Sequence, residues 1–97
     1  MYVIELTFTC PAEEVEPQVQ PHLDYLDVHY QARDFIASGA KNPRDGGIIL
    51  ANGALSRERL DSIISEDPFH QHGLAEYRIV EFIADKYDDA IAPLING

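Results

Sequence analysis

The order of apolar and amphipathic segments constrains the fold of this chain more than any other sequence feature. Four segments are rich in β-branched, aromatic and aliphatic residues, which indicates β-strands: residues 2–9, 34–40, 47–52 and 74–82. Two further segments, residues 21–34 and 56–67, have the apolar spacing and the boundary residues of helices. The predicted order is therefore strand, helix, strand, strand, helix, strand.

Proline and glycine mark the boundaries of these elements. Pro21 suits the first turn of a helix, where its missing N–H group is not needed, and Pro68 is expected to end the second helix. Three prolines in residues 11–21 predict an irregular acidic segment before the first helix. An Asp-Gly pair at residues 45–46 predicts a turn between the second and third strands.

This order of elements predicts an α+β fold. Two βαβ-like halves, with the middle strands joined as a hairpin, match the ferredoxin-like βαββαβ arrangement and its antiparallel sheet. Both helices of such a fold cover one face of the sheet, so the other face needs a cover of its own. In a chain of 97 residues we expect a second copy to provide it. We therefore predict a single domain, residues 1–97, that forms a homodimer, with the tail 84–97 packing on the partner.

The charge of the chain excludes several classes of partner. Seventeen acidic residues against seven lysines and arginines give a net charge of −10, which repels nucleic-acid phosphates and anionic membranes. An anionic substrate would therefore need a local basic pocket. No segment is long enough to span a membrane, and the first residues lack a signal sequence. We expect a cytoplasmic protein that binds neither nucleic acid nor membrane.

Metal and cofactor motifs are weak in this sequence. His70 and His72 could bind a metal together with Asp67, but no fourth ligand accompanies them, so we expect two water-exposed loop histidines and no metal. The single cysteine, Cys10, excludes an intramolecular disulfide and is interpreted as a small packed residue, with a reactive thiol as the alternative. No glycine-rich phosphate loop and no G-x-S-x-G motif is present, and we expect no cofactor.

The first predicted helix carries polar groups on its apolar side. At about 100° per residue, Tyr25, His29 and Arg33 share the side that faces the core. Their polar ends could reach around the sheet edge or bond at an interface, or they could line a small-ligand pocket between helix and sheet. His22, in the first turn, could exchange protons near neutral pH or be a surface or capping histidine. The spacing does not identify its carboxylate partner.

The chain resembles the YCII-related (YciI-like) family in three segments, PHLDYL, ASGAKNPRDGGIIL and EDPFHQHGLAEYRIVEF, taken in this order and spacing. The resemblance extends from the first strand to Phe82. It implies a ferredoxin-like fold, homodimers of the dimeric α/β-barrel type, and a histidine–aspartate pair in a pocket. The family's histidine falls on His22 and its D-P-F aspartate on Asp67, while Ser38 and Gly39 match an S-G pair beside the same pocket.

The resemblance therefore gives Asp67 a second role beside ending a helix. A buried aspartate would fix the tautomer of His22 and make the two residues an acid–base pair, with Phe69 as a pocket wall. We predict proton transfer in an isomerisation or elimination on a small cyclic or enolisable substrate, without metal or nucleotide. The alternative is a non-catalytic dimeric module that binds a small molecule or assists an enzyme.

Overall fold

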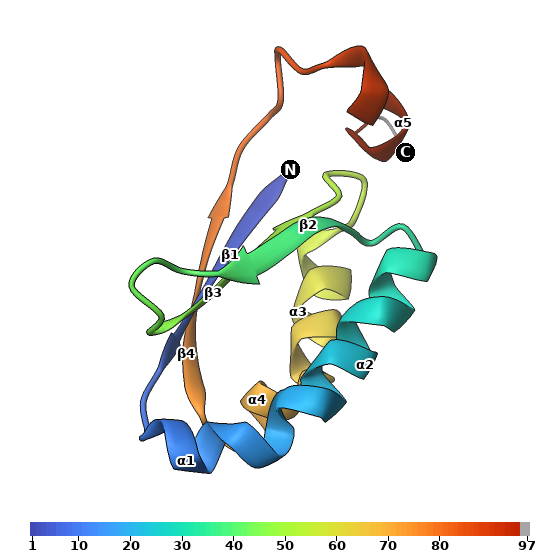
Figure 1. The fold of residues 1–97 in the computed structure, drawn as a ribbon. Coiled ribbons are helices and arrows are strands. Elements are labelled where there is room, and N and C mark those ends of the chain that lie inside the picture. Colours follow the sequence, from blue (N-terminus) through green and yellow to red (C-terminus); the bar gives the residue numbers. More distant parts are fainter. Residues whose placement is uncertain (96–97) are drawn as a thin grey trace.

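The fold, taken from a computed structural model that describes residues 1–95, is one sheet with helices on one side (Figure 1). Four strands form the sheet in the order β2-β3-β1-β4, each antiparallel to its neighbours: β1 (Tyr2–Phe8), β2 (Phe35–Ala40), β3 (Gly46–Ala51) and β4 (Ala75–Glu81). The long helices α2 (Val19–Gln31) and α3 (Arg57–Ser65) follow β1 and β3. The predicted α+β fold with its ferredoxin-like order of elements is confirmed.

Three short helical segments lie where the sequence predicts irregular chain or a helix end. The segment before α2 forms α1 (Ala12–Val15) and a 3-10 turn, η1 (Glu16–Gln18). Two glutamates in the first turn of α1 suit the positive end of a helix. As predicted, α3 ends before Pro68, and Pro68 begins a further short helix, α4 (Pro68–Gln71), because proline fits the first helical position.

The core lies between the sheet and the helices. On β1, Tyr2, Ile4 and Leu6 are buried, and the alternation of side chains along a strand places all three on the same face. Ile4 pairs with Ile49 of β3 on one side and with β4 on the other. From α3, the buried residues at helical spacing include Leu60, whose full burial contributes roughly 1.5–3 kcal/mol. The buried residues of β1 and of both long helices thus belong to one hydrophobic core.

The opposite face of the sheet carries the alternate side chains of the same strands. Val3 pairs with Leu50 on β3 and with Val80 on β4, forming a row of partly exposed apolar side chains. Beside this row, Glu5 forms ion pairs with Lys41 and Arg78, each at 3.4 Å. Because α2 and α3 lie on the other side of the sheet, they leave this row uncovered (Figure 1).

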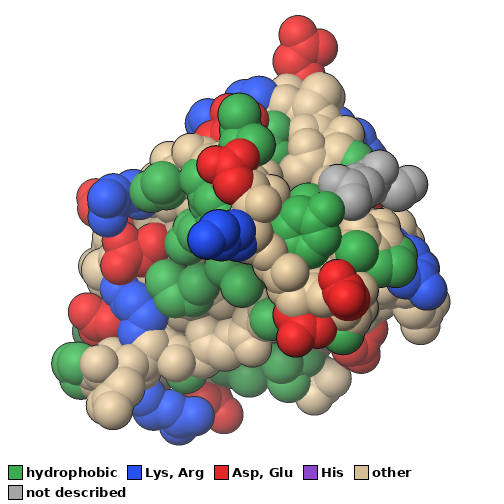
Figure 2. Space-filling view, turned by 90° about the horizontal axis from the view of Figure 1, so that it is seen from above, with side chains coloured by type: hydrophobic (Ala, Val, Ile, Leu, Met, Phe, Trp, Pro, Cys, Tyr) green, Lys and Arg blue, Asp and Glu red, His purple; other side chains and the backbone are tan. Residues whose placement is uncertain are grey.

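After β4 the chain leaves the sheet and reaches a short 3-10 turn, η2 (Asp89–Ile91), and then α5 (Ala92–Ile95). Phe82 and Ile83, between β4 and this tail, have exposed fractions of 43% and 85%. Seen from the α5 end, hydrophobic side chains lie between acidic and basic ones, and no histidine shows on this face (Figure 2). The predicted tail, 84–97, includes residues 96–97, which lie outside the described residues.

Within residues 1–95, no helix combines the length and the hydropathy that crossing a lipid bilayer requires. The cytoplasmic location stays a prediction.

Candidate active site

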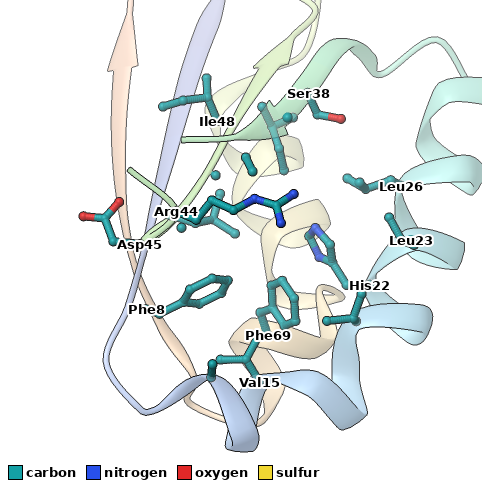
Figure 3. A pocket seen from close by; sticks show the side chains of 18 of the residues that line it. Phe8, Val15, His22, Leu23, Leu26, Ser38, Arg44, Asp45, Ile48 and Phe69 are labelled. Atoms are coloured by element: carbon teal, nitrogen blue, oxygen red, sulfur yellow. The ribbon is translucent and has the colours of Figure 1, made fainter. Parts of the chain in front are cut away.

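A cavity of about 720 Å³ opens between the sheet, the first half of α2 and the β2–β3 hairpin (Figure 3). Its size falls within the range typical of small-molecule pockets. The walls are mainly apolar and include Leu6, Phe8, Val15, Leu26, Ile49 and Phe69. Few polar side chains face it, and His22, Ser38 and Arg44 are among them. A largely apolar hollow with a few polar groups is suited to a small organic ligand.

His22 is held at the wall of this cavity by two contacts. Its Nδ1 atom lies 2.7 Å from Oδ1 of Asp67, and its ring stacks on Phe69 with the ring centroids 4.1 Å apart and the planes 13° from parallel. The side chain keeps an exposed fraction of 13%, so the imidazole is sheltered but reachable. Figure 3 shows the ring directed into the hollow. Both contacts fix the orientation of the ring.

Asp67 is fully buried and accepts hydrogen bonds from three donors. Oδ1 accepts from the backbone N–H of Phe69 at 3.0 Å as well as from His22, and Oδ2 accepts from the hydroxyl of Tyr77 at 2.7 Å. The bond to Phe69 caps the first turn of α4. These donors offset the cost of burying a carboxylate, which would otherwise be large. The aspartate is therefore a fixed acceptor beneath the cavity wall.

The carboxylate also determines which nitrogen of His22 carries a proton. Because an ionised carboxylate can only accept hydrogen bonds, Nδ1 of His22 carries the hydrogen and donates it to Asp67. In the neutral imidazole the lone pair then lies on Nε2, away from Asp67. The same carboxylate acts on Tyr77: burial, reinforced by the charge of Asp67, raises the pKa of this tyrosine well above its ordinary value of 10.0.

Four of the residues predicted from the sequence line the cavity: His22, Ser38, Gly39 and Phe69. Asp67 lies behind the wall and touches the cavity's histidine. The hydroxyl of Ser38 is 2.6 Å from that of Tyr30, which links β2 to α2 at this end of the sheet. The structure thus gathers one end of β2, the start of α2 and the start of α4 around one hollow.

Tyr25, His29 and Arg33 are not among the residues that line the cavity. The hydroxyl of Tyr25 donates to the carbonyl of Ile63 at 2.9 Å, inside the core. Arg33 is exposed just after α2, with a φ of 62°. These side chains serve the packing and the end of the helix.

His29 forms a second buried histidine–aspartate pair, with Nδ1 2.7 Å from Oδ2 of Asp34. Its Nε2 has no hydrogen-bond partner among the described residues, and Oε1 of Glu66 lies 3.6 Å away.

Sequence reasoning did not single out Arg44 and Tyr77. Arg44 belongs to a segment whose Pro and Asp-Gly residues indicate only a turn. Tyr77 could have been found from strand alternation, since it pairs with the buried Leu6 and shares its face of the sheet. His70, predicted to lie in a loop, lies in α4 and is exposed, and its ring packs against Tyr77 with the centroids 5.4 Å apart. Among residues 1–95 no cluster of three or more His, Cys, Asp or Glu side chains could hold a metal ion.

The family model of the YCII-related domain matches residues 1–83. The chain belongs to the YCII-related family. Comparison with curated protein sequences gives no match.

Among solved structures, this YCII-related protein is similar to 5-chloro-2-hydroxyhydroquinone dehydrochlorinase from Burkholderia phenoliruptrix AC1100, in complex with 2,5-dihydroxybenzoquinone. The similarity has a TM-score of 0.69 and a sequence identity of 17%, and it covers 93% of this chain and 98% of the dehydrochlorinase chain. At this identity the likeness shows a shared fold.

Proposed function

We propose that this YCII-related protein is an isomerase- or lyase-type enzyme that transfers a proton on a small cyclic or enolisable substrate. The observation that carries the proposal is the contact of 2.7 Å between His22 and the buried Asp67 at the wall of a cavity of about 720 Å³. Positioned proton transfer by histidine typically contributes 10²- to 10⁴-fold to a rate. A histidine held by a buried carboxylate at a cavity wall suits such a step.

The pair supports a simple sequence of proton transfers. Nε2 of His22 takes a proton from a carbon or a hydroxyl group of the substrate, and the released electron pair forms a double bond. In an elimination a leaving group departs with its bonding electrons and the imidazolium then gives its proton to the leaving group or to water. In an isomerisation the proton returns to another atom of the substrate. Asp67 stabilises the imidazolium that forms between these steps, because its carboxylate is fixed 2.7 Å from Nδ1.

The comparison structure supports the reaction class. Its name describes a dehydrochlorinase of a hydroxylated ring compound, and its ligand is a small planar quinone. The aromatic residues Phe8 and Phe69 line the cavity of the present chain and suit a flat ligand. Their rings pack edge to face, with the ring centroids 5.4 Å apart. The identity of the substrate does not follow from a similarity of 17% sequence identity.

Turnover of a compound panel tests this proposal. Wild-type protein is incubated with chlorinated hydroquinones and small cyclic ketones, and chloride release and solvent deuterium exchange are followed. We expect His22→Gln to lower the rate by about 10²- to 10⁴-fold. The matched control is His72→Gln, since His72 is exposed and not part of the cavity. Equal rates for wild type and His22→Gln would refute the role of His22. Binding of panel compounds without any turnover would favour the non-catalytic binding module instead.

We further propose that the protein forms a homodimer through the uncovered face of the sheet. The row of Val3, Leu50 and Val80 is apolar, and a second copy placed face to face would remove it from water. The tail beyond β4 would then pack on the partner. Light scattering at micromolar concentration should give twice the mass of one chain.

Leu50→Glu should shift the protein to the monomer, whereas Val28→Glu, on an exposed position of α2, should not. Wild-type protein with the mass of one chain would contradict the dimer.

A further inference from the structure

Arg44 is a cavity residue with no role in the proton transfer. Among the described residues that line the cavity, it is the one lysine or arginine. Figure 3 shows its side chain extending from the β2–β3 hairpin into the hollow, with the guanidinium group directed toward the imidazole of His22. The cavity therefore has two nitrogen-bearing groups that face each other, one from the hairpin and one from α2.

The guanidinium of Arg44 forms no ion pair among the described residues, although the protein has a net charge of −10. Its neighbour Asp45 points away from the hollow and pairs with Lys41 at 3.2 Å. Glu16 also lines the cavity but does not pair with Arg44. An arginine offers five N–H donors in a planar fork that matches a carboxylate or similar oxyanion. These donors are available to a ligand.

The backbone of the hairpin positions this side chain. The N–H of Phe8 donates to the carbonyl of Asp45 at 2.8 Å, and the N–H of Lys41 donates to the carbonyl of Gly46 at 3.0 Å. The side chain of Lys41 also donates to the hydroxyl of Thr7 at 3.1 Å. The two ends of the turn are thus tied to β1 and β3, and Arg44 extends from an anchored segment.

We propose that Arg44 binds a negatively charged oxygen substituent of a small planar ligand, while the reacting part of the same molecule faces His22. The substituent is a carboxylate or an ionised ring hydroxyl, which share the oxyanion that the guanidinium recognises. A local cation is needed because the overall charge of the protein repels anions. This inference deepens the proposed function by naming its substrate class, but anion binding by Arg44 does not require that His22 be catalytic.

Binding measurements with matched probes test the inference. Benzoate and benzamide have nearly the same shape and differ in charge, while 2,5-dihydroxybenzoquinone supplies ionised ring hydroxyls and 2,5-dimethoxy-1,4-benzoquinone is the neutral quinone with oxygens at the same ring positions. Titration calorimetry should show tighter binding of the anionic member of at least one pair to wild type. In Arg44→Met the Kd of that anion should rise by about 10- to 100-fold, and the Kd of its neutral counterpart should be unchanged.

Two further variants sharpen the measurement. Arg44→Lys keeps the charge but loses the planar fork, so it should restore part of the affinity. Arg59→Met is the matched control, because Arg59 is exposed on α3 and does not line the cavity. Circular dichroism confirms that each variant is folded. The pair with the larger charge preference identifies the substituent as a carboxylate or a ring hydroxyl.

The inference is overturned if wild type binds neither anion more tightly than its neutral counterpart, or if Arg44→Met binds the anions as tightly as wild type. The variants His22→Gln and Arg44→Met distinguish this inference from the proposed function. Anion binding that depends on Arg44, in a protein without turnover, would support the role of Arg44 and count against the proposed enzyme. Turnover that depends on His22 but not on Arg44 would support the enzyme and count against the role of Arg44.

Discussion

Asp67→Ala should destabilise the protein strongly, because it removes the carboxylate that accepts three hydrogen bonds. The variant leaves the N–H of Phe69 and the hydroxyl of Tyr77 without their partner, and both bonds are at least partly buried. Each buried donor left unpaired costs about 1–3 kcal/mol. His22 is excluded from this sum because its side chain, 13% exposed, can meet water. The expected loss in the free energy of unfolding is therefore about 2–6 kcal/mol.

Asp67→Asn provides the second variant if the alanine variant does not fold. An amide oxygen can still accept from Phe69, and the shape of the side chain is kept, so the expected loss is about 1–2 kcal/mol. Tyr77→Phe removes one donor and leaves the other two, and it should cost about 1 kcal/mol. From the most to the least stable, the expected order is then wild type, Tyr77→Phe, Asp67→Asn and Asp67→Ala.

Guanidinium chloride unfolding at 25 °C measures these differences. The midpoint concentration of denaturant should fall in the stated order while the m-value stays constant. A constant m-value means that unfolding exposes the same surface area in each variant as in wild type. In a thermal scan each kcal/mol corresponds to roughly 4–8 °C for a domain of this size. An Asp67→Ala variant within about 0.5 kcal/mol of wild type would refute the assignment of Asp67 as a shared buried acceptor, since that is the range of neutral surface changes.

The remaining predictions concern pH and two local contacts. Burial raises the pKa of Tyr25 and Tyr77 above the ordinary value of 10.0, so above about pH 10 only the unfolded chain loses these protons. Below that pH these tyrosines should not affect stability. Above it the free energy of unfolding should fall by up to about 1.4 kcal/mol per pH unit for each tyrosine. A denaturation midpoint that stays constant from about pH 9 to 11 would disprove this. Gly46→Ala should prevent correct pairing of β1 with β3, because the added methyl group would overlap the carbonyl oxygen of Leu6; a wild-type melting temperature would contradict it. Ser56→Ala should lose about 1 kcal/mol in urea unfolding, since the serine hydroxyl accepts the N–H of Arg59 at the start of α3; an unchanged midpoint would argue against that cap.

The sequence predicts the long elements of the fold because each carries a repeated apolar pattern. It does not predict α1 and α4, which have four residues each, since so short a helix is stabilised by its end residues and by contacts elsewhere in the fold. Asp67 illustrates the difference. The sequence indicates a helix end there, whereas the structure uses its side chain to begin a new turn.

The candidate site was only partly predictable for a related reason. His22 and Asp67 are 45 positions apart, and no spacing rule brings them together, so the family resemblance was needed to pair them. His29 is correctly placed on the core-facing side of α2, but its partner is Asp34. That contact depends on the left-handed turn at Arg33, which reverses the chain after the helix. The role of a polar residue on an apolar face thus depends on the loop that follows.

The walls of the cavity come from segments that differ in how readily they tolerate substitution. The imidazole and its carboxylate come from the starts of α2 and α4, whereas Arg44 comes from a surface turn between two strands. Surface turns accept substitutions and insertions far more readily than helices packed on a core. Substitutions in the β2–β3 hairpin can therefore change the polar groups that face the cavity without disturbing the contact between His22 and Asp67.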